Sequence, residues 1–315
     1  MRRAARTGLR SSCADASHPV KEEAMTGITP LYRDFTSVDE LNRAYDIEAT
    51  VPDFGAYAGD FVARSAAYRD EARGLLDVRY GPTVDETYDV FLPIADAPGP
   101  RPALFFIHGG YWKATTSKVW SYVARGLAAR GFVVAVENYA LCPRVSIAEI
   151  VRQHRAAYAH FFAHAGDYGV DVDRIVISGH SAGGHAVATL LQADWVGDYG
   201  LPREPFAGAL PVSGVFDLRP LVHTFLNTDL HLDEGAADSL SVLSTPPVVP
   251  SLVVAYGNDE TPEFERQSID FAAMVSSSGH PVEVVVRENN HFDILESLAD
   301  GTGELARIVE RLAGV

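Results

Sequence analysis

A serine set between glycines is the part of the sequence with the clearest capacity for chemistry. Residues 179–183 read GHSAG, a G-x-S-x-G pattern. The pattern directly follows an apolar run and directly precedes a stretch with helical spacing, so Ser181 falls at a strand-to-helix corner. In that setting the pattern forms a sharp turn that exposes a nucleophilic hydroxyl at a helix N-terminus. We predict Ser181 as a nucleophile; the alternative is a serine in an ordinary tight turn.

A serine nucleophile needs a base, and the base needs a carboxylate to orient it. His291 lies at the C-terminal end of the last predicted strand, the edge at which sites form in open parallel sheets. We predict it as the base; the alternative is an ordinary surface histidine. Asp259 follows the preceding strand and is the predicted orienting carboxylate. Glu260, next to it, and Asp293, two residues after His291, are the rivals. The chain order Ser, Asp, His is that of one hydrolase fold.

Acyl transfer also needs N–H groups aimed at the developing oxyanion. The segment ALFFIHGGYW ends a buried strand with two glycines, whose lack of side chains lets backbone N–H groups face a cavity. We predict an oxyanion hole from the N–H groups of Gly109, Gly110 and Ala182. His108 is predicted to brace this loop. The alternative is a plain glycine turn after a strand.

Three further side chains are predicted to line a substrate pocket. Tyr111 and Trp112 follow the two glycines and could form a flat wall for a ring-shaped substrate, or could be core. His185 lies one turn into the helix after the serine motif and is more suited to packing or pocket lining than to catalysis. No metal site is predicted, because no HExxH motif and no paired Cys/His spacing occurs.

The elements that must position these residues alternate along the chain. Strand-like runs are predicted at 75–81, 86–93, 103–110, 132–140, 174–181, 206–217, 251–260 and 282–291. Helical patterns lie at 117–130, 146–168, 182–194, 262–277 and 293–313. Strands alternating with helices indicate an α/β protein with a mostly parallel sheet of about eight strands and helices on both faces.

Burial and insertions can also be anticipated from these patterns. The first two runs alternate, as strands exposed on one face do, and the later runs are nearly continuous, as strands buried on both faces are. A helical segment with a break at Pro52 precedes the sheet. Residues 218–247 do not fit the alternation and are predicted to be a helical cap, or lid. We expect one domain over residues 25–315.

Composition excludes several classes of protein. The net charge of -16 argues against a nucleic-acid binder, since phosphates would be repelled. Cys13 and Cys142 are the two cysteines, too few for a disulfide framework; two independent thiols fit a reducing compartment, so we expect a cytoplasmic protein. The sequence contains no run of about 18 apolar residues, so no membrane span is predicted.

The first residues differ in composition from the rest. Residues 1–24 are rich in arginine and in small polar residues, and no apolar stretch follows Arg2 and Arg3. A secretory signal needs such a stretch, so we expect a disordered tail, with Met25 as an alternative translation start.

Several segments together resemble the kynurenine formamidase (arylformamidase) family, close to the hormone-sensitive-lipase-like esterases. The similar segments are LYRDFTSVDELNRAYD, HGGYW, NYALCPRVSIAEIVRQ, GHSAGGH, NDETPEFERQS and NNHFDILE, which span most of the chain from about residue 31. One departure is NYALCP, where relatives commonly carry an arginine after the tyrosine. The resemblance implies an α/β-hydrolase fold and a triad of Ser181, Asp259 and His291.

The resemblance also implies a reaction. A serine hydrolase of this kind cleaves an N-formyl aryl amide, N-formyl-L-kynurenine to L-kynurenine and formate, with no cofactor. A carboxylesterase acting on short-chain or aryl esters is the alternative, since such esterases share the motifs. A non-catalytic ligand receptor is the third reading, and it is disfavoured because candidates for all three triad residues are present. The expected partner is a small acyl amide or ester, and the sequence leaves the oligomeric state open, a homodimer included.

Overall fold

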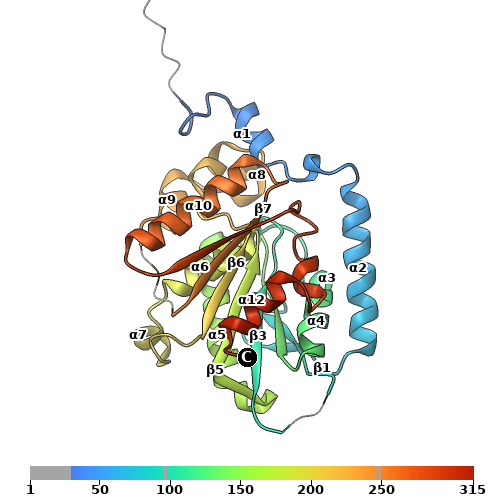
Figure 1. Cartoon of the computed structure of the whole chain (residues 1–315). Helices are drawn as coiled ribbons and strands as arrows, with labels where there is room; N and C mark the ends of the chain where they lie inside the picture. The colour runs from blue at the N-terminus through green and yellow to red at the C-terminus, as the bar shows by residue number, and fades with distance from the viewer. Residues whose placement is uncertain (1–29, 96–97, 246, 248–249) are drawn as a thin grey trace, which may run out of the picture.

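The computed structural model describes residues 30–95, 98–245, 247 and 250–315. Its centre is an eight-stranded sheet with the order β1-β2-β4-β3-β5-β6-β7-β8 (Figure 1). The strands are β1 (Gly74–Arg79), β2 (Thr87–Phe91), β3 (Arg101–Ile107), β4 (Val133–Asn138), β5 (Val170–His180), β6 (Gly208–Val212), β7 (Leu252–Gly257) and β8 (Val282–Arg287). The β2 strand runs antiparallel to both of its neighbours, and the other neighbouring strands are parallel. The predicted α/β fold and its mostly parallel sheet are confirmed.

Helices cover both faces of this sheet. In Figure 1, α4 (Ala124–Ala129) and α12 (Glu304–Leu312) lie in front of the strands, and α6 (Ala182–Leu191) lies behind them. The remaining helices of the sheet region are α3 (Ser117–Trp120), η2 (Ser121–Val123), α5 (Ile147–Ala163), η3 (Ala165–Tyr168), α7 (Trp195–Tyr199), α10 (Pro262–Ser277) and α11 (Glu296–Ala299). The predicted helix at 117–130 is in fact three short pieces, α3, η2 and α4.

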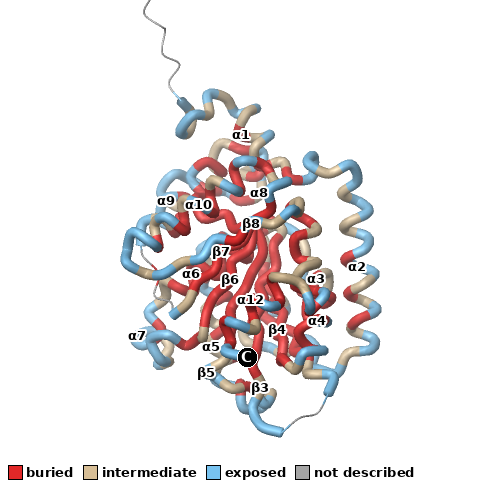
Figure 2. The backbone as a smooth tube through the Cα atoms, viewed as in Figure 1, coloured by how far each residue is buried: buried red, intermediate tan, exposed pale blue. Residues whose placement is uncertain are grey.

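The central strands form the core because both of their faces are covered. Figure 2 shows the central strands as a continuous buried block. All residues of β4, β6 and β7 are buried, which explains their near-continuous apolar sequences. Three burial predictions were wrong: β1 has no buried residue, β2 is buried along its whole length, and β8, at the edge of the sheet, is largely exposed. The period of a strand does not reveal which helices cover it, so edge and interior are decided only by the fold.

The segment before the sheet runs across the top of the molecule and down one side of it (Figure 1). It comprises α1 (Val38–Tyr45), η1 (Glu48–Thr50) and α2 (Phe54–Glu71), with the predicted break at Pro52 between the last two. Figure 1 shows α1 at the top of the molecule, beside the cap and α10, and α2 as a long helix down its right side. The capping box of Ser37 and Glu40 starts α1.

The insertion after β6 is helical, as predicted. It contains η4 (Arg219–His223), α8 (Asn227–Leu230) and α9 (Glu234–Leu240). Residues 1–24, Cys13 and Met25 lie outside the described residues. Of the helices in the described ranges, none is both long enough and apolar enough to cross a membrane.

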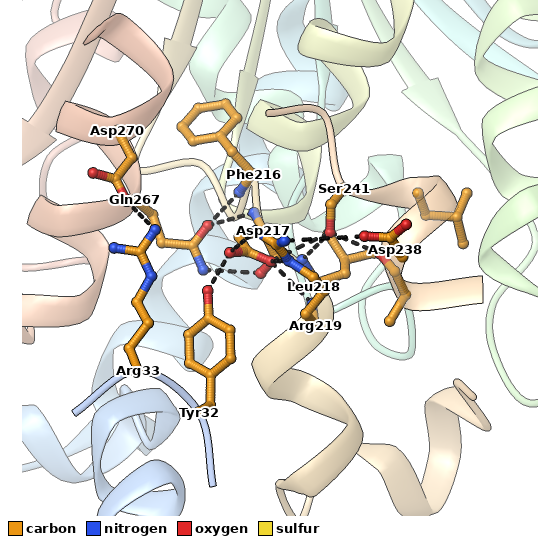
Figure 3. Close-up of polar contacts among 12 residues, drawn as sticks. Tyr32, Arg33, Phe216, Asp217, Leu218, Arg219, Asp238, Ser241, Gln267 and Asp270 are labelled. Carbon is orange, nitrogen blue, oxygen red and sulfur yellow. Dashed lines mark hydrogen bonds and ion pairs between the residues drawn. The ribbon is translucent and has the colours of Figure 1, made fainter. Parts of the chain in front are cut away.

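A buried polar network joins the start of the described chain to the cap (Figure 3). The Tyr32 hydroxyl donates to the carboxylate of Asp217, which also accepts from the Arg219 guanidinium and the Ser241 hydroxyl. Gln267 of α10 accepts from the N–H groups of Phe216 and Asp217, both at 2.6 Å. The N-terminal segment is thereby fixed to both the cap and α10.

Candidate active site

Ser181 occupies a strained corner between β5 and α6. Its backbone angles are φ 57° and ψ -117°, a conformation that costs a non-glycine residue about 1–3 kcal/mol and persists only where the surroundings enforce it. The Ser181 N–H donates to Val212 O at 2.9 Å, and its carbonyl accepts from Gly184 N–H at 2.8 Å. A Cβ at Gly183 would lie 2.1 Å from Ile107 O, so only glycine allows this close approach. The predicted strand-turn-helix corner is present.

The Ser181 hydroxyl is unpaired in the described protein. The residue is 2% exposed, and its Oγ has no hydrogen-bond partner among the described residues. It borders a pocket of about 140 Å³ at the N-terminus of α6. The positive end of the helix dipole favours negative charge there, as an oxyanion intermediate requires.

His291 lies in the loop after β8 and borders the same pocket. Its Nδ1 is 2.7 Å from Oε2 of Glu260, and the Glu260 side chain is fully buried. An imidazole that donates from Nδ1 to a carboxylate presents Nε2 as the acceptor. The His291 Nε2 is buried and has no partner among the described residues, so it is free to act as a base.

The predicted contact between Asp259 and His291 is wrong, since Asp259 is exposed. The chain turns after β7, and the Asp259 N–H donates to Asn289 O at 3.2 Å. The turn directs the next side chain, Glu260, back towards the end of the strand, where Gly257 N–H donates to Oε1 at 2.8 Å. The Ser213 hydroxyl donates to the same oxygen at 2.5 Å. Glu260 thus takes the place predicted for Asp259.

Asp293, the other rival, stabilises the loop that carries His291. One of its oxygens accepts from the Asn290 N–H at 2.9 Å and from the Asn289 amide at 3.0 Å. The Asn290 side chain in turn accepts from the N–H of Phe292 at 2.8 Å. Asp293 therefore shapes the loop and does not contact the imidazole.

Hydrogen bonds to the carbonyl oxygens of the glycine loop set the direction of its N–H groups. The Tyr139 hydroxyl donates to His108 O at 2.9 Å, and the Thr115 hydroxyl donates to Gly109 O at 3.0 Å. In a trans peptide the C=O and N–H point in opposite directions, so the N–H groups of Gly109 and Gly110 point away from these donors. Among the described residues, none accepts a hydrogen bond from the N–H groups of Gly109, Gly110 or Ala182.

The same loop lies directly against the nucleophile. A Cβ built on Gly109 would be 3.0 Å from the Cβ of Ser181. Gly110 has φ 112°, and a Cβ there would lie 2.2 Å from Ala114 O, so the loop requires glycine at this position. Gly109 therefore lies against Ser181, and Gly110 borders the same pocket; an oxyanion hole formed by their N–H groups and that of Ala182 stays a prediction.

His108 is buried inside this loop. Its ring stacks on Tyr139 with centroids 4.3 Å apart, and its Nδ1 is 2.7 Å from Gly109 O. Burial lowers the pKa of His108 to about 4, so the ring is neutral near pH 7. These contacts are those of a residue that braces the loop.

Of the three predicted pocket residues, the structure places only Tyr111 in the pocket. Trp112 is fully buried and packs edge-on against His185, with ring centroids 5.3 Å apart. His185 is also fully buried, with its Nε2 2.8 Å from Leu240 O. Through these contacts Trp112 and His185 join the glycine loop and α6 to the cap.

The N-terminal segment supplies pocket walls that the sequence reasoning did not anticipate. The pocket is lined by Ile47, Glu48, Phe54, Ala58, Phe61, Gly110, Tyr111, Lys113, Ala114, Thr115, Val119, Trp120, His180, Ser181, His291 and Phe292. Phe54, Ala58 and Phe61 lie on one face of α2 at i, i+4 and i+7 spacing, a signal visible in the sequence. The aromatic and aliphatic side chains make the interior mainly apolar.

The cap borders a second hollow beside this pocket and not the pocket itself. The hollow, of about 350 Å³, is lined by Phe225 and Leu226 of the cap together with Tyr45 and Asp46, and it shares Ile47, Glu48, Tyr111 and Lys113 with the pocket. Lys113 is paired with Asp229 of the cap at 2.6 Å. The predicted lid therefore lies at the outer side of the site.

No cluster of three or more His, Cys, Asp or Glu side chains suited to a metal ion occurs in the described residues. The chemistry available at the site is that of a buried hydroxyl, an imidazole paired with a carboxylate, and three free backbone N–H groups. Together these groups can perform nucleophilic acyl transfer.

Comparisons with known proteins show the family and the fold of the chain. A family model described as BD-FAE matches residues 88–194. The kynurenine formamidase of Danio rerio is 30% identical over 253 residues, covering 78% of this chain and 84% of that protein. A solved structure from Silicibacter sp. tm1040 superposes with a TM-score of 0.75 at 31% identity, covering 86% of this chain and 98% of the other. Esterase B of Lactobacillus rhamnosis, at 18% identity, shares the fold with a TM-score of 0.64, covering 85% of this chain and 96% of that one.

Proposed function

Because the chain belongs to the kynurenine formamidase family of α/β-hydrolases, we propose that it hydrolyses N-formyl aryl amides through Ser181, His291 and Glu260. N-formyl-L-kynurenine, which gives L-kynurenine and formate, is the proposed substrate. The observation that carries the proposal is the buried Glu260–His291 pair at the same aromatic pocket as the unpaired Ser181 hydroxyl.

The proposed reaction begins with acylation of the serine. His291 Nε2 takes the hydroxyl proton as Ser181 Oγ forms a bond to the formyl carbon, and the carbonyl electrons move onto oxygen. The N–H groups of Gly109, Gly110 and Ala182 stabilise that oxyanion. When the intermediate collapses, the C–N bond breaks and His291 gives its proton to the leaving arylamine. Glu260 stabilises the imidazolium in between.

Deacylation uses the same groups in reverse. His291 Nε2 accepts a proton from water, whose oxygen attacks the formyl ester on Ser181. The second intermediate collapses with cleavage of the bond to Oγ, which recovers its proton from His291. Formic acid leaves and ionises to formate, and no oxidant, reductant or metal takes part in any step of this scheme.

The shape and polarity of the pocket support an aryl substrate with a small acyl group. The space of about 140 Å³ is bordered by the rings of Phe54, Phe61, Trp120 and Phe292. Flat apolar walls favour a planar ring by stacking and by burial of apolar area. The formyl group is the smallest acyl group and fits the limited space between Ser181 and the glycine loop.

Steady-state kinetics with purified protein test this function. The kcat/KM for N-formyl-L-kynurenine is expected to exceed that for p-nitrophenyl acetate and butyrate. Ser181→Ala is expected to lower kcat by at least three orders of magnitude without changing the circular dichroism spectrum, since it removes the nucleophile. Preference for the esters by orders of magnitude would replace the formamidase by a carboxylesterase. Near-normal turnover by folded Ser181→Ala would refute the nucleophile.

A further inference from the structure

The proposed mechanism leaves a buried, unpaired polar side chain of the pocket lining unused. His180 borders the pocket and is 2% exposed, and neither of its ring nitrogens has a hydrogen-bond partner among the described residues. Two other polar groups of the lining have partners: the Thr115 hydroxyl accepts from the Trp120 indole, and Lys113 pairs with Asp229. An unpaired buried polar group is destabilising, so it is conspicuous in an otherwise apolar pocket.

The position of His180 relates it to the leaving group. Its ring centroid is 4.5 Å from that of His291 and 5.8 Å from that of Trp120. A Cβ built on Gly109 would lie 3.4 Å from His180 Nδ1, so the ring sits between the glycine loop and the base. The leaving nitrogen must approach His291 Nε2 to receive its proton, and it therefore lies on the side of the pocket that His180 occupies.

The ring of His180 is neutral at working pH. Burial, and then the nearby His291, hold the pKa of His180 well below its ordinary value. A neutral imidazole has one N–H and one nitrogen with a free lone pair. His180 can therefore accept one hydrogen bond from a bound substrate.

The chemistry of an anilide supplies the matching donor. When the carbonyl carbon becomes tetrahedral, the nitrogen turns pyramidal and directs its lone pair to the proton on His291 Nε2. Its own N–H then points elsewhere and needs an acceptor. An ester has an oxygen at this position, with no hydrogen to donate. An acceptor placed here would thus distinguish the two classes of substrate.

We propose that the unprotonated ring nitrogen of His180 accepts the N–H of the scissile anilide and makes the pocket selective for amides over esters. This inference rests on the function proposed above, and it assigns to the residue before the nucleophile a contact with the substrate. The hydrogen bond strengthens as the nitrogen becomes pyramidal, so it acts mainly on kcat and less on KM.

The test compares one amide with one ester in three variants. The substrates are N-formyl-4-nitroaniline and 4-nitrophenyl acetate, and the variants are His180→Leu, His180→Gln and, as the matched control, His164→Leu, an exposed histidine on the surface. His180→Leu is expected to lower the amide-to-ester ratio of kcat/KM at least tenfold, mostly through kcat. His180→Gln keeps an acceptor oxygen and is expected to restore part of the ratio, and His164→Leu to leave it unchanged.

A second measurement separates this role from a structural one. The rate at which a fluorophosphonate labels Ser181 depends on the nucleophile and base but involves no N–H on the leaving group. If His180→Leu slows labelling, anilide hydrolysis and ester hydrolysis by the same factor, the residue is structural and the inference is wrong. An unchanged ratio also refutes it while leaving the proposed function intact. Absence of anilide turnover by the wild-type protein refutes both.

Discussion

At the scale of single residues, the carboxylate of Glu260 is held from three directions. The Ser213 hydroxyl and the Gly257 N–H donate to one oxygen, and His291 Nδ1 lies against the other. Three donors satisfy a carboxylate that is fully removed from water, which would otherwise be costly to bury. The same donors fix its direction, so that the imidazole it orients presents Nε2 to the pocket.

Glu260→Gln is expected to lower kcat by at least a hundredfold, because an amide neither stabilises the imidazolium nor fixes the tautomer that leaves Nε2 free. Asp259→Asn is the matched control: it changes the adjacent, exposed carboxylate and is expected to keep kcat within about twofold, as surface substitutions usually do. Steady-state kinetics on both folded variants, with thermal unfolding as the check of folding, measure the difference. A larger loss of kcat in Asp259→Asn than in Glu260→Gln would mean that Asp259, and not Glu260, is the carboxylate of the proposed triad.

The sequence located Ser181 and His291 but could not choose between two adjacent carboxylates. Ser181 and His291 follow strands, and the strand ends of a parallel sheet meet at one edge, so their meeting is predictable. Asp259 and Glu260 share that location. The direction of each side chain depends on a single turn between β7 and α10, for which no periodic pattern exists.

At the scale of elements, the N-terminal segment is as much a part of the site as the strand ends. Ile47, Phe54 and Phe61 border the pocket, and the Tyr111 hydroxyl of the glycine loop donates to Tyr45 O at 2.8 Å. The Tyr45 hydroxyl in turn donates to Glu263 of α10 at 2.6 Å. The segment is fixed on both sides of the pocket that it covers.

Tyr32→Phe is expected to reduce the free energy of unfolding by about 1–3 kcal/mol, since it removes the donor to the buried Asp217 carboxylate shown in Figure 3. Arg33→Ala is the control next to it. Its ion pair with Asp270 is partly exposed, and its loss is expected to cost less than about 1 kcal/mol. Urea unfolding of the three proteins measures both values. Equal losses would mean that the buried hydroxyl contributes no more than a surface pair.

The eight strands and most helices were predictable because their apolar patterns reflect local geometry. The packing of α2 over the pocket was harder to predict from the sequence. The stripe of Phe54, Ala58 and Phe61 indicates a helix face that contacts something apolar, but the partner, which includes Phe292, is distant in the sequence. Likewise, the residues after the two glycines predict an aromatic wall, and only the folded structure shows that Tyr111 borders the pocket while Trp112 is buried in the core.

At the scale of the whole molecule, buried neutral histidines couple folding to pH. Burial lowers the pKa of both His108 and His185 to about 4. The unfolded chain binds these protons near pH 6.5. The stabilisation is therefore complete above pH 6.5 and is lost as the pH falls towards 4, by about 3 kcal/mol for each histidine.

His185→Leu is accordingly expected to weaken the pH dependence of stability between pH 6.5 and 4, whatever it does to stability at pH 7. Urea unfolding at pH 7, 5.5 and 4.5 gives the slope for the wild-type protein and the variant, and subtraction removes the contribution of the carboxylates. His164→Leu, at an exposed position, is expected to keep the wild-type slope. A His185→Leu slope equal to that of the wild type would show that the histidine is not held neutral.

The packing of Phe54 and Tyr57 against Phe292, with ring centroids 5.0 and 5.6 Å apart, has a consequence for biosynthesis. The ribosome makes the two aromatic residues of α2 long before their partner. Until Phe292 is made, this apolar face of the nascent chain lacks its partner and is open to chaperones or to aggregation. A chain that stops before residue 291 also lacks the proposed base, so hydrolytic activity is expected only after synthesis has passed this residue and the chain has folded correctly.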